Sequence, residues 1–147
     1  MIMMRWLVLP IMMVIFCSQG LANDFKLLSR AEPVVRMVLQ EAANEPFAGM
    51  VAIAGVALDR VDDRRWPTSV RDVIYEPDQF TGMNIALRRY SQAQITRARL
   101  ATATAEVGTR PCGTVLWYHT TDVKPSWRKR LAVKCQLGVH VFYGDEK

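Results

Sequence analysis

Hydrophobic positions first recur at helical spacing just after Pro33. Four apolar residues occupy positions i, i+3, i+4 and i+7: Val35, Val38, Leu39 and Ala42. This pattern predicts an amphipathic helix of about 10 to 12 residues. Pro46 disfavours the helical conformation at the residue before it, so we expect the helix to end near residues 44–45.

The following stretch is apolar on every side. Nearly every residue up to Leu58 is apolar or small, and the chain becomes polar abruptly at Asp59. A helix without a polar face is typical of a protein interior, so we predict a central buried helix over residues 47–61. Beyond it, Thr68 is a candidate N-cap for a short helix that runs to Ile74.

The pattern changes towards the C-terminus. Residues 83–106 predict one or two helices with exposed faces, whereas residues 113–119 and 136–143 are rich in β-branched and aromatic side chains and predict two strands. Residues 120–130 are predicted to form a basic loop between the strands. Helices first and a small sheet last predict an α+β fold, a single mainly helical domain with a small C-terminal antiparallel β element.

The N-terminus is typical of a signal peptide. An apolar run is followed by Gly20 and Ala22, small residues that match the usual cleavage pattern. We expect residues 1–22 to be removed, which leaves residues 23–147 as one exported domain. The run is shorter than the roughly 20 residues of a membrane-spanning helix, so we expect no stable membrane span after cleavage. An uncleaved anchor and a lipoprotein site at Cys17 are the alternatives.

Charge narrows the choice of partner. The chain has 19 basic and 14 acidic residues, and removal of the signal peptide would delete Arg5 and no acid, so the net charge would fall from +5 to +4. A modest basic excess suits an acidic polymer. Because the protein is expected to act in the periplasm or outside the cell, we expect a cell-wall target, no nucleic-acid partner and a monomer.

The cysteines leave two alternatives open. Cleavage leaves Cys112 and Cys135, an even pair in a compartment where disulfides persist. Each cysteine precedes its own predicted strand, however, so a simple hairpin would place them at opposite ends, beyond bridging distance. The pair is therefore either a disulfide or two buried thiols.

One carboxyl occupies a position that suits acid catalysis. Glu41 lies on the flank of the first predicted helix, at the border between core and surface. Partial burial would raise the pKa of this carboxyl, as a glycosidic general acid requires if it is to hold its proton near neutral pH. Glu45 lies on the same flank if the helix reaches it, where a second negative charge would raise one pKa of the pair further. An ordinary solvated helix glutamate is the alternative for each.

Two histidines suggest a different chemistry. His119 and His140 belong to the predicted strands and could form a zinc site with Glu41. No H-E-x-x-H or comparable spacing places two ligands on one element. We therefore favour histidines that are hydrogen-bonded in or beside the sheet, and expect no metal and no other cofactor.

Four blocks of sequence follow one another in the order of a known family. Residues 40–61 resemble the pattern E-A-x-x-E-P-x-x-G-x-x-A-V-A-x-V-x-L-N-R-V, and residues 70–80 resemble V-x-x-V-I-Y-x-x-x-Q-F. Residues 117–127 and 137–143 resemble F-H-x…P-x-W and I-G-x-H-x-F-Y. The chain thus resembles the SleB-like cell-wall hydrolases, the family of the spore-cortex-lytic enzymes.

The resemblance implies an α+β catalytic domain related to lytic transglycosylases and lysozyme-like enzymes. It also implies cleavage of peptidoglycan between N-acetylmuramic acid and N-acetylglucosamine, by a lytic transglycosylase or muramidase route, with Glu41 as the general acid. Other residues at motif positions are expected to bind the substrate: Glu45, Asp59, Tyr75, Gln79, Phe80, His119, His140 and Tyr143.

Two departures from the family pattern matter. One is the tail after Q-F, which usually contains serine and is Thr81-Gly82 here. The other is the family's Asn, which is Asp59 here, a residue that has no amide donor and adds a negative charge. The departure at Asp59 leaves open a catalytically inactive peptidoglycan-binding accessory protein. A zinc-dependent amidase is the third alternative.

Overall fold

The computed structural model describes residues 31–80, 83 and 86–145, and the predicted signal peptide lies outside this part of the chain. Within these residues four α-helices come first: residues 31–42 (the first helix), α2 (Phe47–Asp62), α3 (Val70–Tyr75) and α4 (Gln92–Glu106). A three-stranded antiparallel sheet follows. This order confirms the predicted α+β fold with a small C-terminal sheet.

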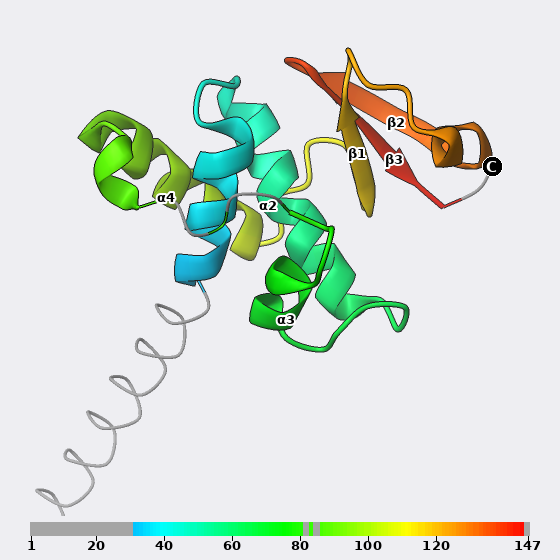
Figure 1. The fold of residues 1–147 in the computed structure, drawn as a ribbon, viewed down its shortest axis with the longest axis horizontal. Coiled ribbons are helices and arrows are strands. Elements are labelled where there is room, and N and C mark those ends of the chain that lie inside the picture. Colours follow the sequence, from blue (N-terminus) through cyan, green and yellow to red (C-terminus); the bar gives the residue numbers. More distant parts are fainter. Residues whose placement is uncertain (1–30, 81–82, 84–85, 146–147) are drawn as a thin grey trace, which may run out of the picture. The chain divides into compact units, whose positions relative to one another are not determined.

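The helix α2 runs between α4 on one side and the sheet on the other (Figure 1). Every residue from Gly49 to Arg60 is buried, as the apolar sequence predicts. The apolar stripe of the first helix packs into the same core, where Val34 and Val38 are fully buried. No helix in the described residues is both long and apolar enough to cross a membrane. The helix α2 is thus the scaffold that carries Asp59 and Arg60 at its C-terminal end.

The short helix α3 begins one residue later than predicted. Its N-cap is Ser69, whose side chain accepts a hydrogen bond from the backbone N–H of Asp72. The predicted cap at Thr68 was wrong because α3 starts at Val70, which places Ser69 beside the free N–H groups of the first turn.

The helix α4 is preceded by a short 3₁₀ helix, η1 (Leu87–Arg89). Ser91 and Gln94 form a capping box, in which each side chain bonds the other residue's backbone N–H. The described part of residues 83–106 thus contains one α-helix and one 3₁₀ helix.

The sheet has the order β1-β3-β2, and both pairings are antiparallel. Its strands are β1 (Trp117–Thr120), β2 (Ala132–Leu137) and β3 (His140–Gly144). The prediction of one strand over residues 136–143 was wrong, because Gly138, with φ of 56°, turns the chain between β2 and β3.

The segments before and after β1 also differ from prediction. The predicted strand over residues 113–119 begins only at Trp117, because Gly113 has φ of 70° and lies in a turn. The predicted loop over residues 120–130 contains a second 3₁₀ helix, η2 (Ser126–Arg130). That helix carries three consecutive cations beside the sheet.

Cys112 and Cys135 form a disulfide, with their Cα atoms 5.5 Å apart. The geometric objection to this bridge was wrong, because Cys135 lies within β2 rather than before a strand. Since β1 pairs with β3 and not with β2, the assumed hairpin does not exist. The bridge ties the segment before β1 to β2, the edge strand on the far side of β3.

Candidate active site

Glu41 lies in the last turn of the first helix, at the border that its sequence position predicts. Met37 and Val38 beside it are fully buried, whereas Glu41 itself is half-buried. Its Oε2 atom accepts a hydrogen bond of 3.1 Å from the hydroxyl of Tyr118 in β1. The carboxyl is thus held by a neutral donor while part of it stays accessible.

Two opposing effects set the pKa of Glu41. Burial raises the pKa and is the larger effect, while the hydrogen bond from Tyr118 lowers it by stabilising the carboxylate. The net result is a pKa above the ordinary value of 4.5. Burial and the adjacent Glu41 carboxylate raise the pKa of Tyr118 well above its usual value, so its hydroxyl keeps its proton. The pair therefore offers a carboxyl that holds its proton at a higher pH than a solvated glutamate.

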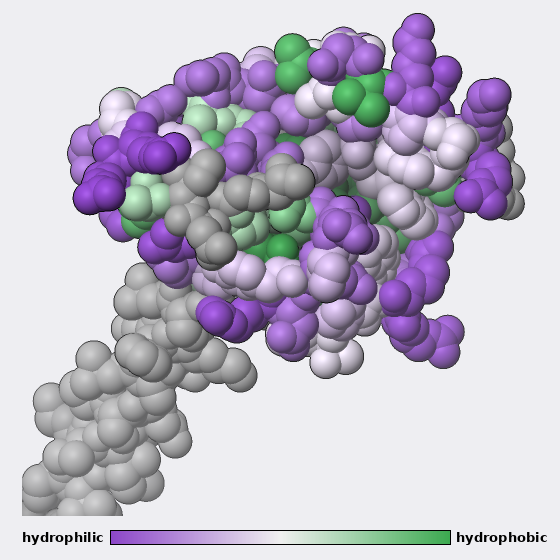
Figure 2. All heavy atoms as spheres, viewed as in Figure 1, coloured by the Kyte–Doolittle hydropathy of each residue, from purple (hydrophilic) through white to green (hydrophobic). Residues whose placement is uncertain are grey.

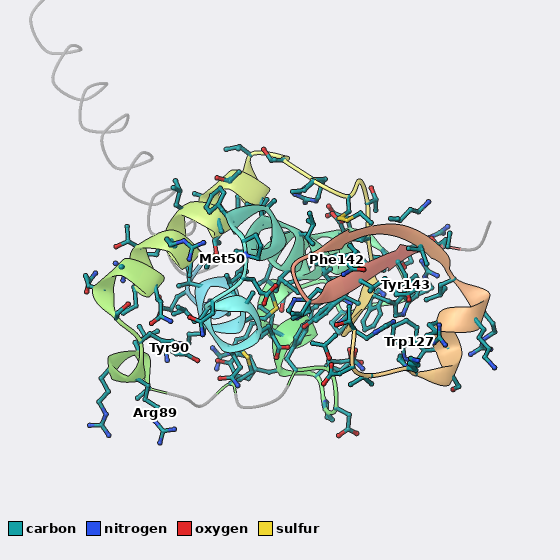
Figure 3. The ribbon with its side chains drawn as sticks, turned by 90° about the horizontal axis from the view of Figure 1, so that it is seen from above. Met50, Arg89, Tyr90, Trp127, Phe142 and Tyr143 are labelled. Atoms are coloured by element: carbon teal, nitrogen blue, oxygen red, sulfur yellow. A yellow bond between two sulfur atoms is a disulfide. The ribbon has the colours of Figure 1, made fainter. Side chains whose placement is uncertain are left out.

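Tyr118 belongs to a cluster of rings on the face of the sheet that meets the helices. Its ring centroid lies 5.4 Å from that of His140 and 6.0 Å from that of Phe142, both in β3. Phe80 stacks on it at 6.5 Å. Phe142 is fully buried and lies where α2 and the sheet meet (Figure 3). These contacts fix the Tyr118 ring and hence the position of its hydroxyl beside Glu41.

Glu45 follows the first helix rather than extending it, because the helix ends at residue 42. Its Oε2 atom accepts a hydrogen bond of 2.9 Å from the backbone N–H of Val139 and lies 3.7 Å from Nδ1 of His140. Burial lowers the pKa of His140, and the charge of Glu45 opposes this shift. The carboxylate of Glu45 thus faces the β2–β3 turn.

Arg60 connects α2 to the segment that carries Gln79 and Phe80, two of the residues predicted to bind the substrate. Its Nε atom donates to the carbonyl of Leu116 at 2.9 Å, and its Nη1 atom donates to Oε1 of Gln79 at 3.2 Å. The guanidinium lies 4.0 Å from the Trp66 ring centroid and 5.3 Å from that of Phe80. Burial lowers the pKa of Arg60 to about 10, so it remains charged at neutral pH. Arg60 therefore holds Gln79 and Phe80 near the start of β1.

The sheet separates the predicted site residues into two groups. Side chains alternate along β1, so Tyr118 faces the helices while His119 faces away. Tyr143 lies on the outer face with His119, at a ring distance of 5.3 Å. His119 Nδ1 lies 2.7 Å from the carbonyl of Thr120, which can only accept, so Nδ1 is the donor. In the neutral ring Nε2 is then the acceptor, and it takes a hydrogen bond of 2.8 Å from the Tyr143 hydroxyl. His119 and Tyr143 do not converge on Glu41.

Asp59 is buried, and both of its oxygens have partners within the protein. One oxygen accepts from Nε of Arg110 at 2.6 Å, and the other accepts from the backbone N–H of Val115 at 3.0 Å. An asparagine would turn its NH₂ group towards one of these donors. The departure from the family pattern thus has a structural reason.

Tyr75, at the end of α3, has the opposite environment. Its side chain is exposed, and the Arg71 guanidinium lies 5.1 Å from its ring centroid. The ring is therefore free to meet a ligand, although no contact joins it to Glu41 in the described structure.

Tyr118 and Arg60 were not among the predicted site residues. A signal for Tyr118 was available, because strand alternation places it on the face opposite His119. A signal for Arg60 was also available, because it occupies the Arg position of the L-N-R-V pattern, although its contacts with Trp66 and Phe80 depend on other segments.

The described residues contain no group of three His, Cys, Asp or Glu side chains that could hold a metal ion. The residues of the zinc alternative are divided by the sheet, with His119 on the outer face and Glu41 and His140 on the inner one.

Comparison with known proteins finds a matching family model and similar curated proteins. Residues 44–143 match a family model described as Cell Wall Hydrolase, a match that begins just after Glu41. The spore cortex-lytic enzyme of Bacillus subtilis (strain 168) is 37% identical over 123 residues, which are 82% of this chain and 37% of that protein. The corresponding enzyme of Oceanobacillus iheyensis is 35% identical over 82% of this chain and 41% of its own length. The chain thus spans about two fifths of these relatives.

Two solved structures have the same fold. The catalytic domain of the germination-specific lytic transglycosylase SleB from Bacillus anthracis aligns with a TM-score of 0.66 and 30% identity, covering 78% of this chain and 93% of that domain. The catalytic domain of the Bacillus cereus SleB protein aligns with a TM-score of 0.63 and 29% identity, over 77% of this chain and 91% of that domain. In both of those proteins the part that this chain matches is described as a catalytic domain.

Proposed function

The chain belongs to the cell wall hydrolase family, and from that premise we propose that it cleaves the glycan strand of peptidoglycan between N-acetylmuramic acid and N-acetylglucosamine. Glu41 is the proposed catalyst. The chain covers nearly all of a solved domain that is described as a lytic transglycosylase, which favours that route over hydrolysis.

The observation that carries the proposal is the environment of Glu41. Burial raises its pKa, while partial exposure leaves the carboxyl accessible to a bound sugar. A general acid must be protonated before it acts and ionised afterwards. The hydrogen bond from Tyr118 favours the ionised state, because this neutral donor stabilises the carboxylate that forms when Glu41 has given up its proton.

One carboxyl is sufficient for the transglycosylase route. Glu41 gives its proton to the glycosidic oxygen as the bond to the anomeric carbon of the muramic acid unit breaks. The C6 hydroxyl of the same sugar then bonds to that carbon, and the Glu41 carboxylate takes the proton that this hydroxyl loses. The product is a 1,6-anhydro sugar, no water is consumed, and no metal or cofactor takes part.

A two-carboxylate hydrolase would need a second carboxyl about 5 to 9.5 Å from the acid. Glu45 is the neighbour in sequence, and its carboxylate is bonded to the Val139 amide at the β2–β3 turn. Its engagement there favours the route with a single carboxyl.

We propose that the chain acts in the periplasm or outside the cell, after removal of residues 1–22, as a monomer. The Cys112–Cys135 disulfide is consistent with a location outside the cytoplasm. The basic excess of the remaining chain suits the anionic wall.

The test is release of fragments from purified peptidoglycan by the wild type, Glu41→Gln and Glu32→Gln. Glu32 is the matched control, because it lies in the same helix and pairs with Arg36 at 3.1 Å. We expect at least a hundredfold loss for Glu41→Gln, on the order of what general acid–base catalysis contributes, and near wild-type release for Glu32→Gln. Undiminished release by Glu41→Gln would remove Glu41 as the catalyst, and inhibition by EDTA would favour the amidase.

A further inference from the structure

A pocket of about 440 Å³ lies on the outer face of the sheet, on the side turned away from Glu41. Its lining comes from four separate parts of the chain: Arg65, Trp117, Trp127, Arg130, Leu131 and Asp145. None of these residues has a part in the proposed cleavage.

Two indole rings form the apolar part of this outer pocket. Trp117 and Trp127 are both half-buried. Trp127 is held by edge-on contacts with His119 at 5.8 Å and with Tyr143 at 5.5 Å, and Figure 3 shows it beside Tyr143. A ring fixed in this way offers an amphipathic surface with little rotamer freedom left to lose on binding.

The polar part of the outer pocket is equally well fixed. Arg65 donates two hydrogen bonds to Asp145, at 2.7 and 3.0 Å, and its guanidinium lies 5.2 Å from the Trp117 ring centroid. Arg65 also donates two hydrogen bonds to Asp63, at 2.8 and 2.6 Å, so one N–H of its Nη1 atom is left for a ligand. The Asp145 oxygens keep acceptor capacity. A fixed donor and acceptor beside an aromatic ring match the hydroxyl groups and the apolar face of a sugar.

The remaining wall is cationic. Arg128, Lys129 and Arg130 follow one another in η2, and within the described residues none of them forms an ion pair. Lys129 and Arg130 are exposed. Hydrophilic side chains crowd the end of the molecule where Figure 1 shows η2 in orange (Figure 2). An unpaired guanidinium at the edge of a pocket favours a ligand with a carboxylate group.

We propose that the outer pocket is a second, non-catalytic glycan site, which takes a sugar unit with a carboxylate-bearing substituent. The sugar stacks on Trp127 or Trp117, its hydroxyls bond Arg65 and Asp145, and its carboxylate pairs with Arg130. The ligand is the acidic, peptide-bearing sugar of peptidoglycan, so the inference rests on the proposed function. A site on the other face of the sheet from Glu41 would hold the enzyme on the polymer between cuts.

The test is co-sedimentation with insoluble peptidoglycan, using the full chain that carries Glu41→Gln so that the polymer stays intact. In that background we compare Arg130→Glu with Arg89→Glu. Arg89 is the matched control, an exposed arginine on the other 3₁₀ helix, far from Trp127 (Figure 3). We expect Arg130→Glu to weaken binding about tenfold, the effect of losing one charge-assisted hydrogen bond, and Arg89→Glu to bind like its parent.

A second arm tests the carboxylate itself. Here the carboxyl groups of peptidoglycan are converted to neutral amides. The parent protein should bind this polymer about as weakly as Arg130→Glu binds native peptidoglycan. Arg130→Glu should bind the amidated polymer no more weakly than it binds the native one. The inference would be overturned if Arg130→Glu bound peptidoglycan as tightly as its parent, or if Arg89→Glu lost as much affinity as Arg130→Glu. In either case fragment release by the wild type would still support the proposed function. Absence of fragment release by the wild type would instead refute the cleavage, whatever the binding shows.

Discussion

The Tyr118 hydroxyl is the group that opposes the effect of burial on Glu41. Removing it with Tyr118→Phe keeps the ring contacts with His140 and Phe142 and deletes only the hydrogen bond. The pKa of Glu41 should then rise further. Since a general acid loses activity as pH rises through its pKa, the alkaline limb of the pH–activity profile should move to higher pH.

The control for this prediction is Tyr143→Phe, which removes a hydroxyl from the outer face of the same sheet. It should leave the alkaline limb in place. A Tyr118→Phe profile that coincides with the wild type would show that this hydrogen bond does not tune Glu41.

The raised pKa of Glu41 also predicts a cost in stability. The unfolded chain ionises Glu41 near the ordinary value of 4.5, whereas the folded protein holds the proton to higher pH. Ionisation therefore favours unfolding, and stability falls as pH rises from that value through the folded pKa. Glu41→Gln cannot ionise, so it should unfold at a higher temperature than the wild type at pH 7 and at the same temperature near pH 3. Calorimetry at both pH values measures this, and a lower unfolding temperature at pH 7 would contradict it.

At the scale of elements, the β2–β3 turn depends on Gly138. Its φ of 56° disfavours any side chain, and an added Cβ would also meet the Glu45 carboxylate and, at 2.8 Å, Cδ of Pro46. Gly138→Ala should therefore cost more than the roughly 1–3 kcal/mol expected for backbone strain alone. Urea unfolding of the purified variant measures the loss.

Gly113→Ala separates the two contributions. Gly113 also has a positive φ, of 70°, but an added Cβ would meet nothing within 4 Å. It should show the backbone cost alone. Equal losses at both glycines would mean that the Glu45 and Pro46 contacts yield without cost.

Sequence periodicity was sufficient to predict the elements whose structure depends mainly on their own residues. The first helix and α2 follow from their apolar spacing, and Glu41 lies at the predicted border of the core. The prediction of one strand over residues 136–143 missed the turn, because the apolar residues Leu137 and Val139 flank Gly138 and hide it. The two-sided division of the site depends on β1 pairing with β3, which no local pattern encodes.

At the scale of the whole molecule, the sheet separates the proposed catalytic residues from the proposed second glycan site. Its inner face holds Tyr118 beside Glu41, and its outer face carries His119 and Tyr143, on which Trp127 of η2 packs next to the outer pocket. The aromatic residues of one short β1–β3 pairing thus serve both faces. A polymer with repeated sugars is a substrate that can occupy both faces at once.

The central claim is that Glu41 alone moves both protons. Mass spectrometry of fragments released in water enriched in heavy oxygen tests it most directly. We expect 1,6-anhydro ends that contain no heavy oxygen from the wild type, and no such fragments from Glu41→Gln. Reducing ends labelled with heavy oxygen, or anhydro ends from Glu41→Gln, would contradict the claim.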